Sequence, residues 1–248
     1  MALKSRLAQA SLVVVVSAAP FASAFAQGAP LPVLIPAGPG AATVDTEAFR
    51  AEALRNDAYS IEASRMALER SRNPKVRAHA DQVIVNRQAT TDALLPPGTS
   101  LTAGGTVVAD GTRDGPFSGP LGLIALPFQI TGAVVGGVVG GVTGTNPVNP
   151  IVDARPGEPG KRVALDPSRQ KRLADLSATS GRRFDRTYTG QQAASDAESV
   201  RLYQAYARNG DSARGRTFAT QATPMLQDEF DRAADLHGRL SEDDDAAF

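Results

Sequence analysis

The chain has 248 residues, a length that suits one ordinary domain with extra segments, or two small domains. Its 26 basic and 26 acidic side chains balance, so no overall field gathers nucleic acid or anionic lipid. Without cysteine it has no disulfide, thiol nucleophile or thiolate metal site, and its few aromatic residues argue against a carbohydrate groove or base-stacking surface.

Residues 1–26 are typical of a secretory signal peptide. Lys4 and Arg6 give a positive start, residues 12–16 an apolar centre, and residues 24–26 the small-x-small pattern that signal peptidase cuts. The alternative is an uncleaved anchor helix, but the apolar centre is too short to cross about 30 Å of hydrocarbon. We therefore expect export to the periplasm or cell envelope.

The segment after the predicted cleavage point is rich in proline and glycine, so we expect residues 27–44 to be flexible. Residues 45–98 form the first predicted helical pair. Asp45 or Thr46 caps the first helix, whose apolar residues recur at three- and four-residue steps. Asn73 and the proline after it begin the second helix at once. So short a turn between two long helices makes them antiparallel.

Residues 99–165 form a hydrophobic, glycine-rich insert between the second and third bundle helices. No charged residue occurs between Gly115 and Val152. Glycines spaced by four residues make a flat strip along a helix, which lets another backbone approach closely in lipid. The strip predicts contact with a membrane or with a second copy, and it consists of Gly132, Gly136, Gly137, Gly140, Gly141 and Gly144.

A single membrane crossing by the insert would leave the two halves of the bundle on opposite sides of the bilayer. Neither half could then bury its apolar stripe. We therefore expect the insert to leave and return on one side, as a re-entrant or surface hairpin, or to stay out of lipid. The alternative is a disordered glycine- and valine-rich loop.

Residues 166–240 form the second predicted half of the bundle. Asp166 and Pro167 start a short helix, a long helix spans about residues 182–208, and a last helix follows. Residues 241–248 are expected to be an acidic, frayed tail. The predicted fold is all-α: an up-down four-helix bundle with an extra short helix and the insert.

Three short motifs resemble one bacterial family. Residues 76–83 (Val-Arg-Ala-His-Ala-Asp-Gln-Val), 184–188 (Phe-Asp-Arg-Thr-Tyr) and 223–227 (Thr-Pro-Met-Leu-Gln) are similar to landmarks of domain of unknown function 4142. The resemblance implies a ferritin-like helical bundle in the periplasm or outer membrane, with no established activity.

The resemblance also implies metal-ligating histidines in three bundle helices. At those positions this sequence has Arg87, Asp196 and Glu229, and Glu62 matches an acidic position of the first helix. Arginine stays protonated and cannot ligate a metal. A ferritin-type site also needs Glu-x-x-His pairs, and neither histidine has a glutamate three residues before it. We therefore expect no metal and no cofactor.

A buried charge cluster could replace such a site. Arg87 and Glu229 each lie on the apolar stripe of their helix. A buried arginine needs a carboxylate partner, because an uncompensated interior charge costs several kcal/mol. We predict that Arg87 pairs with one or more of Glu62, Asp196 and Glu229. The alternative is that these long side chains reach water at the edges of the bundle.

No residue is predicted to be catalytic, since neither His79 nor His237 has a serine, cysteine or second histidine at a telling spacing. We expect an exported, non-catalytic bundle protein that docks on a membrane or associates with itself through the insert, without binding nucleic acid. The alternatives are a metal-binding ferritin-like protein and a stress-related binding module.

Overall fold

The computed structural model of the protein describes residues 34–35, 43–102, 105–109, 117, 150–153 and 160–245. The predicted signal peptide at residues 1–26 and the glycine strip within residues 132–144 lie outside this described part.

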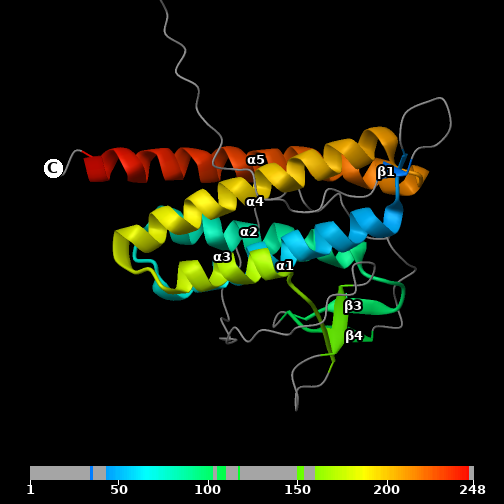
Figure 1. Ribbon diagram of the computed structural model, residues 1–248, viewed down its shortest axis with the longest axis horizontal. Coiled ribbons are helices and arrows are strands. Elements are labelled where there is room, and N and C mark those ends of the chain that lie inside the picture. Colours follow the sequence, from blue (N-terminus) through cyan, green and yellow to red (C-terminus); the bar gives the residue numbers. More distant parts are fainter. Residues whose placement is uncertain are drawn as a thin grey trace, which may run out of the picture.

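Helices make up most of the described chain, which confirms the predicted all-α bundle. The long helices α1, α2, α4 and α5 lie side by side (Figure 1), and the short helix α3 contacts α1 and α4. The helices are α1 (Thr46–Arg70), α2 (Pro74–Leu94), α3 (Pro167–Ser177), α4 (Gly181–Asn209) and α5 (Ala213–Asp245).

Three of these helices begin at side-chain caps that the sequence predicts. Asp45, Asn73 and Asp166 each accept a hydrogen bond from a backbone N–H two or three residues later, at 2.8, 3.0 and 2.9 Å. Pro74 and Pro167 then occupy the first helical positions, where a missing N–H costs nothing. The helix starts are therefore fixed by local chemistry.

The connection between α2 and α4 crosses over the length of the bundle. The C-terminal ends of both helices lie in one core cluster, which contains Leu94 and Tyr206. Their N-terminal ends lie in a second cluster, which contains Val76 and Phe184. Hence α2 and α4 run in the same direction, and the chain between them must return from one end of the bundle to the other. One long crossover is the ferritin-like arrangement of a four-helix bundle, so the helices do not alternate up and down at this connection as the predicted up-down order requires.

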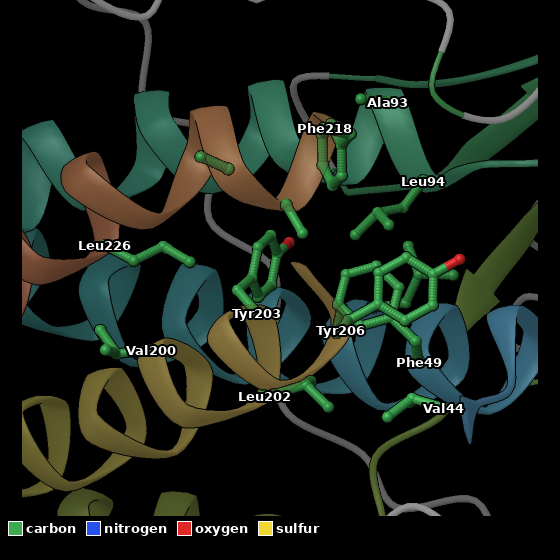
Figure 2. Packing of buried hydrophobic residues seen from close by; sticks show 14 of the residues in the cluster. Val44, Phe49, Ala93, Leu94, Val200, Leu202, Tyr203, Tyr206, Phe218 and Leu226 are labelled. Atoms are coloured by element: carbon green, nitrogen blue, oxygen red, sulfur yellow. The ribbon is translucent and has the colours of Figure 1, made fainter. Parts of the chain in front are cut away.

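The first core cluster draws on both halves of the chain (Figure 2). Phe49 of α1 stacks on Tyr206 of α4 with ring centroids 4.0 Å apart, and Tyr203 meets Phe49 edge-on at 5.1 Å. Phe218 of α5 lies 5.8 Å from Tyr203. The two halves therefore cover each other's apolar faces, as the topology argument requires.

Helix α1 is the most enclosed of the long helices. It contacts α2, α3, α4 and the sheet described below. Only Glu47, Glu69 and Arg70 of its residues are exposed. Because α1 is covered on several sides, even some of its charged residues lie in the interior.

A small sheet joins the two arms of the insert, and the sequence analysis did not predict it. Its strands are β3 (Thr99–Leu101), β4 (Val107–Ala109), β5 (Ile151–Asp153) and β6 (Lys161–Val163), in the antiparallel order β3-β4-β6-β5. The pairing of Val107 with Lys161 connects the outgoing arm to the returning arm. The two arms are therefore held side by side.

The ends of the described chain differ from the expectation in two ways. The segment at residues 27–44, expected to be flexible, supplies the paired strands β1 (Leu34–Ile35) and β2 (Thr43–Val44) and places Val44 in the core. At the other end, α5 continues to Asp245, so the first acidic residues of the predicted tail are helical.

Candidate functional site

A buried cluster of charges occupies the centre of the bundle. The Arg87 guanidinium on α2 is fully enclosed, with 0 % of its side chain exposed. Its Nη1 lies 3.2 Å from Asp57 Oδ1 of α1, and its Nη2 lies 2.6 Å from Asp196 Oδ1 of α4. The same Nη2 lies 2.9 Å from Glu229 Oε2 of α5. Each of the four long helices therefore supplies one charged side chain.

Neutral side chains hold two of the three carboxylates in place. Thr90 and Thr91 donate hydrogen bonds to Asp57 Oδ2 at 2.7 and 3.2 Å. The Asn86 amide donates to Glu229 Oε1 at 2.6 Å. These donors all come from α2, so that helix supplies both the cation and most of the hydrogen bonds that fix its partners.

The balance of charge in the cluster is uneven, because three carboxylates face one guanidinium. Burial raises the pKa of Asp57 to about 6, although Arg87 opposes the shift. Burial likewise raises the pKa of Asp196 to about 8 and raises that of Glu229, with Arg87 again opposing. For Arg87, burial disfavours the charged form, but the three carboxylates outweigh it and raise its pKa. The guanidinium stays charged while the acids hold protons more tightly than usual.

The structure brings together three of the four residues proposed for the cluster. Arg87, Asp196 and Glu229 meet as described above. Glu62 instead pairs with Arg65 on its own helix at 2.7 Å, and its side chain is 31 % exposed. The acid that α1 supplies is Asp57, which the sequence analysis missed.

Several buried polar atoms near the cluster lack a hydrogen-bond partner within the described part of the chain. They include Asp196 Oδ2 and both amide atoms of Gln192, a fully buried residue one turn earlier on α4. Glu229 Oε2 contacts Arg87 without hydrogen-bond geometry. Buried polar atoms without partners are uncommon in folded proteins, so the surroundings of Asp196 and Gln192 on α4 are unusual.

Comparison with known families settles the relationship of the chain. The family described as Domain of unknown function (DUF4142) matches residues 32–97 and 156–236, together more than half of the chain. The chain belongs to this family. Comparisons with curated proteins and with solved structures each give no match.

The DUF4142 match omits residues 98–155, which contain most of the insert and three of the four strands of its sheet. The short helix α3 and all four bundle helices fall largely within the matched ranges. The family match therefore covers the bundle with its charge cluster and leaves out most of the insert.

A second charged cluster in this DUF4142 member ties α3 to the bundle. Arg169 of α3 is 3 % exposed and donates from Nε to Asn56 Oδ1 of α1 at 3.1 Å. It also forms ion pairs with Glu52 and Asp166 and lies 3.9 Å from Glu198 of α4. Because Arg169 links three helices, it fixes the end of the crossover. No sequence signal marked it.

The two histidines form none of the ion pairs that make up the two clusters. Burial, with a smaller contribution from Arg232 and Arg87, lowers the pKa of His79 to about 4, so its ring is neutral. His237 donates from Nδ1 to the Arg186 carbonyl at 3.1 Å. Among the described residues, no three His, Cys, Asp or Glu side chains are grouped to hold a metal ion.

Proposed function

We propose that this chain is an exported, non-catalytic bundle protein of the periplasm or cell envelope that docks on the membrane through its insert. The observation that carries the proposal is the pairing of β4 with β6, at Val107 and Lys161, which holds both arms of the insert together. An uncharged segment that leaves and re-enters the bundle at one place can enter a bilayer from one side.

The uncharged segment is also anchored to the bundle core near its start, at Phe117. The Phe117 N–H donates to the Ala93 carbonyl at 2.6 Å, and its ring lies 5.3 Å from that of Phe218. This contact fixes the place at which the apolar segment leaves the bundle. Within the described residues, no helix combines the length and the apolar character that crossing a bilayer requires.

The burial of the charge cluster supports a non-catalytic role. The side chains of Arg87, Asp57, Asp196 and Glu229 are at most 1 % exposed. A group that acts on a substrate must touch it, and these groups are enclosed on all sides. They are better suited to holding the bundle together than to chemistry.

The docking proposal is tested by removing the apolar segment while keeping its arms. Residues 119–148 are replaced by a short glycine–serine linker, which leaves Phe117 and the sheet strands unchanged. Purified mature proteins, with and without the segment, are floated with phosphatidylethanolamine–phosphatidylglycerol vesicles, and sedimentation gives their oligomeric state. We expect the original to float with the vesicles and the shortened protein to stay at the bottom.

Two results would overturn the docking proposal. Equal flotation of both proteins would mean that the segment does not attach the protein to lipid. Loss of an oligomer without any flotation by the original would assign the segment to self-association. Export is tested separately by the mass of the mature protein, which should correspond to cleavage after Ala26.

A further inference from the structure

One nitrogen of Arg87 is shared between two carboxylates. Arg87 Nη2 lies 2.6 Å from Asp196 Oδ1 and 2.9 Å from Glu229 Oε2, so these acidic groups are close neighbours in the interior. Two carboxylates in one buried site cannot both ionise without strong mutual repulsion, and such pairs share a proton.

The surroundings do not supply enough positive charge to offset three buried acids. Arg87 of α2 contacts Asp57 of α1, Asp196 of α4 and Glu229 of α5. Arg232 of α5 acts on Glu229 from a distance and belongs to an exposed pair with Asp228.

The remaining titratable side chains near the cluster are electrically neutral. Tyr203 lies beside Arg87, and Tyr59 and Tyr188 lie farther along the bundle; burial raises the pKa of all three hydroxyls. His79 is neutral because burial lowers its pKa to about 4. If all three acids were ionised, the cluster would therefore keep an excess of negative charge in the protein interior.

We propose that Asp196 and Glu229 share a proton in the folded protein at neutral pH, and that its loss in alkaline solution loosens α5 from α2 and α4. The proton belongs to the pair rather than to either residue. Asp196 Oδ2 and the Gln192 amide lack hydrogen-bond partners among the described residues. A protonated carboxyl group near them could therefore form a hydrogen bond that an ionised one could not.

The bound proton links stability to pH with a definite sign. Both acids have raised pKa values in the folded state, so the native protein binds more protons than the unfolded chain above about pH 4. The stabilisation that the bound proton provides is therefore complete below the ordinary carboxyl pKa. This stabilisation decreases as the pH rises toward the raised pKa values. For each extra proton that the native state binds, the unfolding constant increases about tenfold per pH unit.

The direct test follows the carboxyl carbons of the unmodified mature protein by carbon-13 NMR, with labelled aspartate and glutamate. At neutral pH we expect an Asp196 or Glu229 carbon at the shift of a protonated acid, moving to the ionised value only in alkaline solution. If every carboxyl carbon has the ionised shift at about pH 7, the proposal is wrong.

A matched pair of variants tests the link to stability. Asp196→Asn keeps an oxygen that accepts from Arg87 but cannot ionise. The slope of the logarithm of the unfolding constant against pH should therefore decrease by about one. Asp231→Asn, at an exposed position two residues from Glu229, should keep the original slope. An unchanged slope for Asp196→Asn would contradict the proposal, and if that variant does not fold, the NMR titration decides.

A small bound cation, rather than a shared proton, could also offset the excess negative charge of the cluster. Urea unfolding of the unmodified protein at about pH 8 is compared in sodium chloride and in tetramethylammonium chloride of equal concentration. We expect equal midpoints, because a proton needs no cation. A large loss of stability when sodium is removed would replace the shared proton with a bound cation.

Discussion

At the residue scale, Arg87 is the side chain on which the centre of the bundle depends. It contacts a carboxylate from each of the three other long helices, and none of these groups reaches water. Deleting one member of a buried ion cluster leaves the others uncompensated, which costs more than the cluster itself contributes. The position therefore tolerates substitution far less than the exposed arginines do.

Arg87→Ala should lower the free energy of unfolding at pH 7 by about 3–5 kcal/mol, measured by urea denaturation. Part of the loss should return at about pH 5, because protonated carboxyls no longer need the cation. Arg239→Ala is the control: this residue forms an exposed pair with Asp235, so its loss should cost less than about 1 kcal/mol. Similar losses for both variants would contradict a special role for Arg87.

The sequence predicts part of this cluster and misses part of it. Arg87 and Glu229 were identifiable because each interrupts an apolar stripe. Asp57 carries the same signal, three residues after Leu54 and four before Ile61, both of which are buried. The family resemblance pointed instead to Glu62, which pairs with Arg65. The resemblance thus pointed to the acids of α4 and α5, whereas the acid of α1 could have been found only from helical spacing.

At the element scale, two glycines of α5 have different surroundings, one in the core and one at the surface. A Cβ on Gly215 would lie 2.6 Å from the Tyr206 hydroxyl and 3.0 Å from the Phe117 ring. A Cβ on Gly238 would meet nothing within 4 Å. The first glycine permits close contact between α4 and α5, whereas the second only weakens the helix.

The two alanine substitutions should therefore change stability in opposite directions. Gly215→Ala should lower the free energy of unfolding by about 1–3 kcal/mol, because the added methyl group overpacks the core around Tyr206. Gly238→Ala should raise it by about 0.5–1 kcal/mol through helix propensity alone. Thermal unfolding followed by circular dichroism measures both, and a gain in stability from Gly215→Ala would show that this contact is not tight.

The elements themselves differ in how clearly the sequence encodes them. The helices carry caps, prolines and long apolar stripes, so their starts were predictable to within a residue or two. At the start of the last helix, Ser212 accepts from the Gly215 N–H, while the neighbouring Asp211 accepts from Thr46 and Tyr206. The strands β3 to β6 have three residues each, which is too short for alternation to be recognised.

At the scale of the whole molecule, the crossover makes the halves of the bundle dependent on each other. Residues from α1, α2, α4 and α5 share one core cluster, so neither half can bury its apolar face alone. The sheet brings the arms of the insert together beside that core, in which Val107 of β4 is buried. The bundle should therefore form without the apolar segment.

Fragments test this dependence. We expect residues 27–98 and residues 160–248, each purified alone, to lack a cooperative thermal transition, because each exposes the apolar face that the other covers. An equimolar mixture should regain a cooperative transition, measured by circular dichroism. Cooperative unfolding of either fragment alone would mean that the halves are independent domains.

The enclosure of α1 has a consequence for the order in which structure can form. This helix is made before any of the residues of α3 and α4 that cover it, and only three of its residues remain exposed once they arrive. During synthesis α2 follows at once, but the side of α1 that α3 and α4 cover stays exposed until residues 167–209 have been made. In the finished protein the relation is reversed: the amides in the middle of α1 should exchange with deuterium more slowly than those at the outer face of α5, because they open only when the entire bundle does.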